Sequence, residues 1–274
     1  DNAGNIVNPW QIIIGDDEYE KNSHELRVAS PGDQPVRFVA GLFWQEQKHD
    51  IFQNYQVIGD IADSITVPGY PDSIWITNQA RVERDEAAFG EVTWDMNDHW
   101  SGTVGARHFR YDNSLKGFFG YSDGYSSNYG IAKCFSDENF RGSPCVNLDD
   151  RVKKSDTIYR ANLTYKFDEN KLIYGTWSEG FRPGGLNRNG NVGPYLPDYL
   201  TNWELGWKTT WDNNRLAFNG AIFQEDWDDI QYSFLPPSGS GLTVIRNAGN
   251  ARIRGLEMDV NWAATYNFRV SDGM

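Results

Sequence analysis

Aromatic, charged and amide side chains gather where a predicted strand runs into a loop rich in glycine and asparagine. The group comprises Trp177, Glu179, Phe181, Arg182, Asn187 and Arg188. In one interpretation they form a lip that binds a ligand, with an aromatic ring for stacking and the Arg182 guanidinium for an anionic or chelated group. In the other, the aromatic ring faces outward and Arg182 makes an ion pair that stabilises the loop. The residue types leave both interpretations open.

Acidic residues cluster at the end of a later predicted strand, at Glu225, Asp226, Asp228 and Asp229. Paired carboxylates can hydrolyse glycosides, and several carboxylate oxygens can bind Ca²⁺. The spacing matches no calcium-loop template, so a solvated acidic rim is the simpler interpretation. The 4 histidines show no metal-ligand spacing, and no nucleophile elbow of the G-x-S-x-G type is present. We therefore predict no catalytic residue, no metal site and no cofactor.

Charged residues of both signs recur on the polar faces of successive predicted strands. The row consists of Arg160, Lys166, Glu204, Lys208, Glu257 and Asp259. Ion pairs between neighbouring strands would satisfy such groups in a polar interior, each contributing up to about 1 kcal/mol. We predict that this row faces the interior and is structural. In a barrel closed by a plug, the same residues would contact the plug.

Two cysteines, Cys134 and Cys145, lie in one segment rich in glycine, serine and asparagine. In an oxidising compartment a disulfide between them would close a short loop and stabilise it by about 2–3 kcal/mol. Free thiols in a reducing compartment are the alternative, because the spacing fits no zinc site. The loop context favours the disulfide.

The elements that must position these side chains are long β-strands. Residues 198–211 show the pattern most clearly, because aromatic and apolar residues alternate with mostly polar ones throughout the segment. Alternate side chains of a strand point to opposite faces of its sheet, so one face is apolar and the other polar. A strand that crosses a membrane in a β-barrel needs about 9–11 such residues, whereas ordinary strands have about 5–6. The length favours a transmembrane strand.

The composition agrees with a membrane barrel. Aromatic residues make up 15% of the 274 residues and include 11 tryptophans, yet the mean hydropathy is −0.63. A barrel with a thin lipid-facing band and a wet interior combines these features, since half of each strand stays polar. No apolar run is long enough for a transmembrane helix. The net charge of −13 argues against a nucleic-acid surface.

Short turns alternate with long connections. No clear period precedes Tyr19; tight turns are predicted near 31–35, 97–98, 168–170 and 212–214, and long connections over about 50–77 and 113–153. Aromatic residues recur beside the short turns, at Trp94, Trp100, Tyr165, Phe167, Trp211, Trp262 and Tyr266. Such a recurrence is typical of a girdle at one membrane interface. The pattern predicts an all-β, antiparallel up-and-down transmembrane β-barrel segment of about ten strands, with short periplasmic turns and long extracellular loops.

Several stretches, taken in order, resemble the barrel of TonB-dependent outer-membrane receptors. They include HELRVASP at 24–31, AAFGEVTWDMND at 87–98, SEGFRPGGLN at 178–187, NWELGWKTTW at 202–211 and NAGNARIRGLE at 247–257. The resemblance runs from about Tyr19 onward. The pieces at 178–187 and 247–257 are the most specific.

The resemblance implies a barrel of about 22 strands closed by a plug domain, with residues 1–274 forming part of the wall and lacking the plug and the barrel ends. It implies a location in the outer membrane of a Gram-negative bacterium. The implied partners are outer-membrane lipid, the plug and the TonB energy-coupling complex of the inner membrane. The implied function is energy-coupled uptake of a scarce small molecule, foremost a ferric siderophore, with cobalamin or glycans as other ligands of the family.

Two alternatives belong to other functional classes. A passive porin-like channel would have the same strands without a plug. A secreted glycan-binding or glycan-cleaving β-protein would need strands of about 4–8 residues with apolar faces turned toward a shared core. The long strands and charged inward faces argue against the second alternative.

Overall fold

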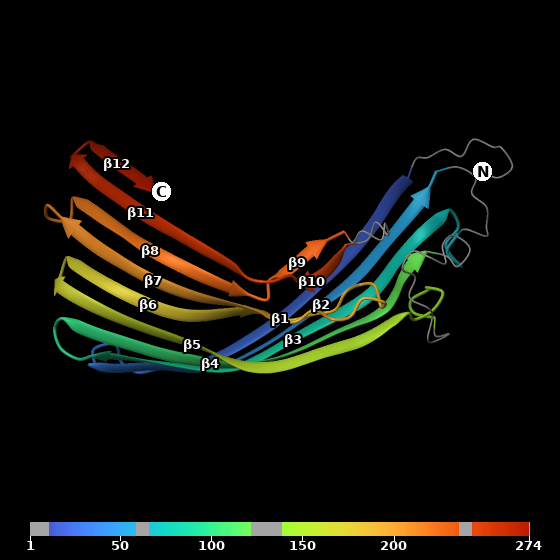
Figure 1. Cartoon of the computed structure of the whole chain (residues 1–274), viewed down its shortest axis with the longest axis horizontal. Helices are drawn as coiled ribbons and strands as arrows, with labels where there is room; N and C mark the ends of the chain where they lie inside the picture. The colour runs from blue at the N-terminus through green and yellow to red at the C-terminus, as the bar shows by residue number, and fades with distance from the viewer. Residues whose placement is uncertain (1–10, 59–65, 122–138, 236–242, 274) are drawn as a thin grey trace.

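The chain forms one long, curved antiparallel sheet, seen in a computed structural model that describes residues 11–58, 66–121, 139–235 and 243–273 (Figure 1). The strands are β1 (Gln11–Ala29), β2 (Val36–Val57), β3 (Ser73–Asp95), β4 (Trp100–Tyr121), β5 (Leu148–Asp168), β6 (Lys171–Arg182), β7 (Asp198–Trp211), β8 (Leu216–Asp228), β9 (Gln231–Phe234), β10 (Val244–Asn247), β11 (Ala251–Thr265) and β12 (Phe268–Gly273). Ten of them make the sheet in the order β1 to β8, β11, β12, while β9 and β10 pair separately.

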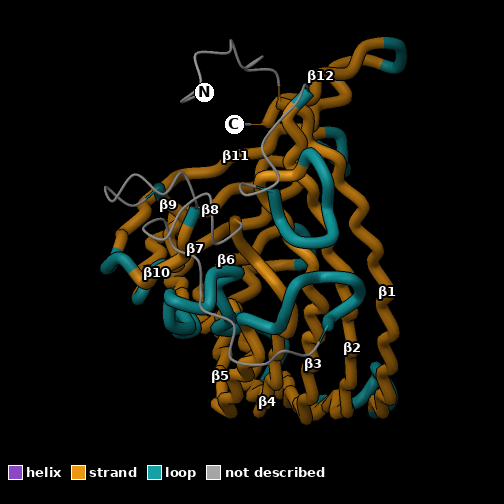
Figure 2. The backbone as a smooth tube through the Cα atoms, turned by 90° about the vertical axis from the view of Figure 1, so that its right-hand side faces the viewer, coloured by secondary structure: helices purple, strands orange, loops and turns teal. Residues whose placement is uncertain are grey.

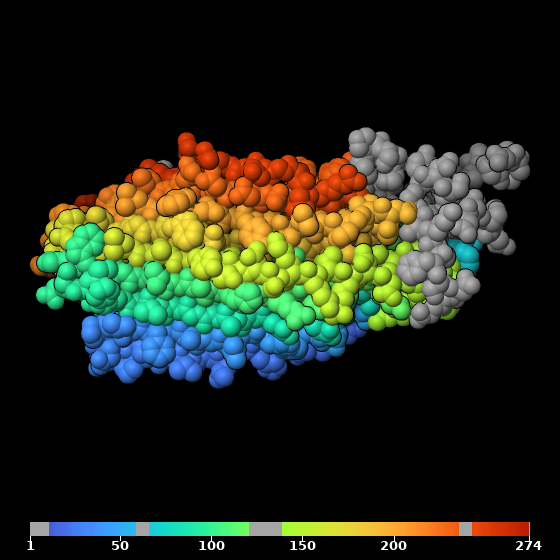
Figure 3. All heavy atoms as spheres, turned by 60° about the horizontal axis from the view of Figure 1, so that its bottom comes forward, coloured from blue at the N-terminus to red at the C-terminus, as the bar shows by residue number. Residues whose placement is uncertain are grey.

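Each strand of the large sheet pairs with the next one along the chain, apart from the small β9–β10 hairpin. Figure 3 shows this as successive bands of colour across the molecule. The described sheet has two edges, β1 and β12. The predicted up-and-down antiparallel segment of about ten strands is confirmed. Within the described residues, no helix is long and apolar enough to cross a membrane.

All the short turns lie at one end of the sheet and the long connections at the other; we call these the turn end and the loop end (Figure 1). The β7–β8 turn shows why short polar residues suit the turn end. Asp212, Asn213 and Asn214 all have positive φ, between 52° and 67°. Aspartate and asparagine tolerate this left-handed conformation better than most residues.

The predicted aromatic girdle is present at the turn end. Trp94 is 53% exposed and Phe167 54% exposed. By alternation Trp94 lies on the same face as Val92, and Phe167 on the same face as Leu163, which is the outward face. Rings on neighbouring strands contact one another, as Trp100 does with Tyr165 at a centroid distance of 4.8 Å. Above this girdle, each outward row is apolar for several residues, as a lipid-facing band requires.

The strands at the loop end are longer than the sequence analysis predicts. Strands β2 and β3 continue through much of 50–77, and β4 and β5 continue into 113–153. Strand β1 already begins at Gln11. The prediction was wrong there because it relied on alternation between apolar and polar residues. Loops cover parts of the sheet at this end, so the alternation disappears while the backbone ladder continues.

Two of the three clusters of buried apolar side chains lie at the loop end of the described structure, and the third, which joins Ala87, Phe109 and Tyr111, lies midway along β3 and β4. One of them joins Val67, Ile76, Phe118 and Cys145, so the connections beside β3 and β4 pack directly on the sheet. Cys145 is 2% exposed and disulfide-bonded. Its predicted partner, Cys134, lies outside the described residues, so the predicted pairing stays a prediction.

Candidate ligand-binding cavity

The connection between β6 and β7, residues 183–197, folds back over the inner face of the sheet (Figure 2). Its Leu186 packs against Leu115 and Leu148. The Gln79 amide donates to the Arg188 carbonyl at 2.9 Å, and the Asn113 amide donates to the Gly184 carbonyl at 3.0 Å. Buried side chains of β3 and β4 thus satisfy the backbone of this connection.

Asn187 ties the same connection to the β9–β10 hairpin. Its amide nitrogen donates to the carbonyls of Gly193, at 2.9 Å, and Ile245, at 3.0 Å. Its amide oxygen accepts from the Ile245 N–H at 2.8 Å. Because one buried side chain makes all three bonds, the connection and the hairpin form a single unit over the sheet. Asn187, predicted to bind ligand, therefore has its hydrogen bonds directed at the protein.

A cavity of about 380 Å³ lies between this unit and the loop ends of β2, β3 and β4. Its walls are Gln53, Tyr55, Trp75, Thr77, Arg81, Phe119, Leu186, Asn187, Arg188, Ser233, Thr243 and Ile245. This volume is within the range of about 300–1,000 Å³ that small-molecule sites occupy. The cavity combines polar groups with three aromatic rings, as such sites usually do.

The charge of the cavity is positive. Burial lowers the pKa of the Arg188 guanidinium, and the nearby positive charge of Arg81 lowers it further, with Asp17 opposing both effects. Arg188 donates to the Gln53 amide oxygen at 3.4 Å, and no acidic side chain of the described ranges lies within ion-pair distance of it. Arg81 has one such contact, with Glu83 at 3.9 Å. An anion placed between the two arginines would relieve their repulsion and restore the interactions they lose on burial.

A histidine adjoins this basic region without adding to its charge. His49 stacks on Tyr19 at a centroid distance of 3.8 Å. Burial lowers the pKa of its imidazole; Asp17 opposes this effect, while Arg81 and Arg188 add to it. The ring is therefore neutral at pH 7, since even an unperturbed imidazole has a pKa of about 6.5.

The aromatic side of the cavity is rigid. Trp75 and Phe119 meet edge to face at a centroid distance of 4.5 Å, and the Trp75 indole N–H donates to Thr77 Oγ1 at 3.1 Å. Tyr55 lies on the adjacent strand, paired with Trp75 in the β2–β3 ladder. Flat, held rings favour ligands that carry aromatic groups.

Of the predicted ligand-binding residues, Asn187 and Arg188 line this cavity, and the other four lie elsewhere. Trp177 is on the outer face beside Trp203, at a centroid distance of 6.2 Å. Glu179 accepts from the Tyr159 N–H at 3.0 Å, which caps the place where β6 separates from β5. Neither residue points toward the cavity.

Phe181 and Arg182 belong to a structural cluster where β6 and β7 bend over β4 and β5. Phe181 stacks on the fully buried Phe109 at a centroid distance of 3.5 Å. The Arg182 Nε donates to both Asp198 carboxylate oxygens at 3.0 Å. Tyr199, on the same cluster, donates to Asp156 at 2.7 Å. The contacts of Arg182 match the second interpretation above, a loop-stabilising ion pair.

Asp198 is the centre of that ion pair and is 1% exposed. Burial alone would raise the pKa of its carboxyl. Hydrogen bonds from Arg182 and from the Gln231 N–H outweigh burial, so the pKa lies below its usual range. The carboxylate thereby holds the ends of β6 and β7 to the β9–β10 hairpin, and so supports one side of the cavity.

The predicted charged row follows the inner faces of β5, β7 and β11. Arg160 pairs with Glu91 at 3.2 Å, and Glu204 accepts from the Tyr174 hydroxyl at 2.7 Å. Arg160, Glu204 and Lys208 line one hollow of the inner face, and Lys208, Glu257 and Asp259 line the next. Lys166 is on the same face of β5 as Arg160, by alternation. The contacts of Arg160 and Glu204 are thus polar ones between strands, whereas Asp259 accepts from Asn261 on its own strand.

Four residues that define the cavity are not predicted from the sequence: Tyr55, Trp75, Arg81 and Phe119. Tyr55 and Trp75 fall in the connection predicted over 50–77, and Phe119 falls in the one predicted over 113–153. The alternation of Trp75, Thr77, Gln79 and Arg81 places these four side chains on one face of a strand and could have identified them as neighbours. However, the segment is short, and this face mixes aromatic with charged residues. It therefore lacks the apolar face that identifies a spanning strand. Within the described residues, no group of three or more histidine, cysteine or acidic side chains is placed to hold a metal ion.

Known proteins resemble the chain over almost its whole length. The pesticin receptor of Yersinia enterocolitica is 23% identical over 278 aligned residues, covering 94% of the chain and 36% of that receptor. The ferric-pyoverdine 358 receptor of Pseudomonas putida is 21% identical over 83% of the chain and 27% of its own length. The crystal structure of the ferric yersiniabactin uptake receptor of Yersinia pestis superposes with a TM-score of 0.70 at 18% identity, covering 96% of the chain and 35% of that structure.

The chain thus spans about a third of the length of the pesticin receptor. A family model described as "TonB dependent receptor-like, beta-barrel" matches residues 4–273. That match takes in all twelve strands of the described structure. The chain belongs to the TonB-dependent receptor-like β-barrel family, whose members are β-barrel proteins of the Gram-negative outer membrane.

Proposed function

We propose that the chain forms part of the barrel wall of a receptor that takes up a ferric siderophore across the outer membrane. The observation that carries this proposal is the cavity on the inner face, which Arg81 and Arg188 line together with three aromatic rings. A ferric chelate with anionic oxygen donors and aromatic groups complements both kinds of side chain. Similar proteins named ferric-pyoverdine 358 receptor and ferric yersiniabactin uptake receptor support the ligand class.

The rest of the mechanism follows from the family. A plug domain would close the barrel and contact the inner charged row, and the TonB complex would supply the energy to move the plug. In this proposal the wall captures the chelate and performs no catalysis. Asn187 and Asp198 matter indirectly, because they hold the connection and the hairpin that roof the cavity.

The test is uptake of radioactive iron by iron-starved cells that produce the full-length receptor, offered a panel of ferric siderophores. We expect one chelate class to accumulate, and accumulation to stop when a protonophore removes the energy source. A deletion strain provides the baseline. Accumulation that persists without energy would indicate a passive channel, and equal uptake by the deletion strain would contradict the proposal.

A further inference from the structure

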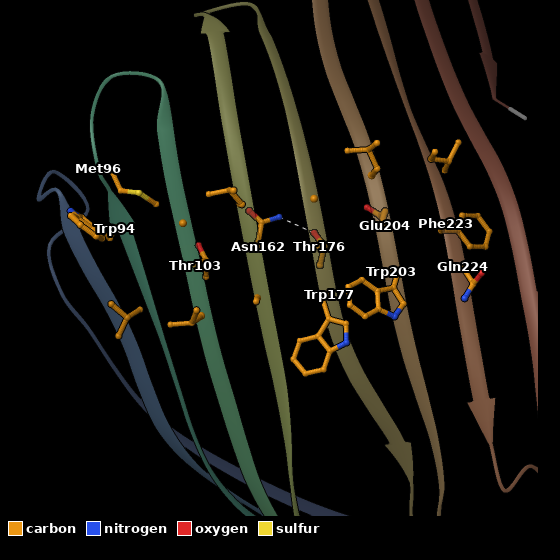
Figure 4. Close-up of a pocket in the computed structure, with 18 of the residues that line it drawn as sticks. Trp94, Met96, Thr103, Asn162, Thr176, Trp177, Trp203, Glu204, Phe223 and Gln224 are labelled. Carbon is orange, nitrogen blue, oxygen red and sulfur yellow. Dashed lines mark hydrogen bonds between the residues drawn. The ribbon is translucent and has the colours of Figure 1, made fainter.

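A second, larger hollow lies on the opposite, outward face of the sheet. It has a volume of about 890 Å³ and runs across β3 to β8 and onto β11. Figure 4 shows Trp94 and Met96 on one side of it and Trp177 and Trp203 on the other. Val104, Leu163, Leu205 and Ile222 project into it, and each is about half exposed or more, at 47–62%. We call this feature the outer groove.

The outer groove exists because small residues form its floor. Gly102, Ala161 and Gly175 occupy adjacent strands where neighbouring positions carry large side chains. A Cβ added at Gly175 would meet only the Glu204 carbonyl oxygen, at 4.0 Å, so the space above this glycine is open. A smooth lipid-facing wall would have medium-sized side chains here instead.

One cation stands at the rim of the outer groove nearest the loop end. Arg254 lies in register with Gln224, which in turn pairs with Trp203. The Arg254 Nε donates to the Gln224 amide oxygen at 2.9 Å. Among the described residues, its two terminal amino groups have no hydrogen-bond acceptor and no acidic partner within ion-pair distance. The neighbouring Arg252 differs, because it pairs with Asp226 at 2.5 Å.

We propose that the outer groove binds a membrane lipid whose acyl chain lies along the groove and whose phosphate is held by Arg254. The apolar walls fit a hydrocarbon chain, and a guanidinium with two free amino groups fits phosphate oxygens. Trp177 and Trp203 mark the level where tryptophan rings meet the lipid headgroups, and Arg254 is at that level. The proposal rests on membership in an outer-membrane barrel family and not on the siderophore assignment.

The test is native mass spectrometry of the delipidated full-length receptor, titrated with dioleoylphosphatidylglycerol or with dioleoylglycerol, which has the same chains and no phosphate. We expect one molecule of the phosphate lipid to bind. Arg254→Gln should weaken its binding about five- to tenfold, and Arg252→Gln, whose charge is already paired, by less than about twofold. Equal binding by wild type and Arg254→Gln, or equal binding of the two lipids, would overturn the proposal.

A second variant tests the groove independently of the charge. Gly175→Ile should fill the floor and lower binding of the phosphate lipid by at least about fivefold, because it occupies the space of the acyl chain. Ala88→Ile is the matched control, an outward-facing exposed position beyond the groove. Heat-modifiable mobility on gels would confirm that both variants fold. If the two variants bind the lipid equally well, the groove is not its site.

Discussion

Strand β3 passes through two different surroundings along its length. At the loop end, residues 73–79 are all buried, so both faces of the strand are covered by protein. At the turn end, exposed and partly buried residues alternate, and Val92 and Trp94 face outward. The hydrogen-bond ladder to β4 is continuous across both parts. A spanning strand therefore keeps one backbone geometry while its side-chain pattern changes. Side chains alternate between apolar and polar where lipid covers one face, and are buried on both faces where loops cover the sheet.

The difference separates the tasks of the two ends. The turn end contributes the apolar band and aromatic girdle that place the sheet in a membrane. The loop end contributes two of the buried clusters, the ion pair at Asp198 and the cavity, and its segments cover the third cluster, midway along β3 and β4. Substitutions should therefore have opposite consequences at the two ends, and this can be tested by making matched changes in each.

The largest effect should come from truncating a buried ring that packs against the loop end of β6. Phe109→Ala removes a fully buried side chain that stacks on Phe181, and should lower the free energy of unfolding by about 3–5 kcal/mol. Val104→Ala, on the same strand but facing outward, should cost less than about 1 kcal/mol, since lipid can fill the space. Urea unfolding in liposomes, followed by tryptophan fluorescence, measures both. Equal costs would contradict the inference that protein buries Phe109 and that lipid surrounds Val104.

A new charge on the outward face should destabilise the fold more near the turn end, where lipid surrounds the sheet, than at the loop end. Leu205→Arg puts a guanidinium in the apolar band, between the midplane and the headgroup level of Trp203, and should cost about 2 kcal/mol of unfolding free energy. Ser155→Arg, also outward but at the loop end, should cost less than about 0.5 kcal/mol because water surrounds it. Urea unfolding in liposomes measures the cost of both substitutions. A large cost for Ser155→Arg would show that the band extends further than we infer.

The two ends also differ in how much an ion pair contributes to the free energy of unfolding. Asp198→Asn removes a buried carboxylate that accepts from Arg182 and from the Gln231 N–H, and should cost about 2 kcal/mol. Asp212→Asn breaks the exposed pair with Arg215 at the turn end and should cost less than about 0.5 kcal/mol. Hydrogen exchange of residues 183–198 should increase only in the first variant. Unchanged exchange there would remove Asp198 from its supporting role.

The smallest effect is a pH dependence of the loop end. The hydrogen bonds that lower the pKa of Asp198 stabilise the fold above the unfolded-state value of about 3.9, and this contribution is lost as the pH falls through the lower folded-state value. Loop-end exchange, corrected for intrinsic rates, should therefore rise below about pH 4. The rise in residues 183–198 should be smaller in Asp198→Asn, which has no carboxyl to titrate at this position. An undiminished rise in this variant would assign the effect to another group.

The same contrast explains what the sequence could predict. Alternation at residues such as Val92, Trp94, Trp203 and Leu205 identifies the turn-end strands, because lipid imposes one simple rule on the outward face. The loop end follows contacts between segments far apart in the chain, such as Gln79 with Arg188 and Asn187 with Ile245. No local pattern encodes those contacts. Arg188 was predicted from its loop position, whereas Arg81 was missed because its part of β3 has no apolar face.

We propose that the loop-end cavity binds an anionic ferric chelate through Arg81 and Arg188. The most direct measurement is the equilibrium affinity of the purified full-length receptor for the chelate that its uptake assay selects. Arg81→Gln with Arg188→Gln should weaken binding more than about tenfold. Arg151→Gln, an exposed arginine paired with Asp112 away from the cavity, should leave the affinity unchanged. An affinity that survives the loss of both cavity arginines would contradict the account.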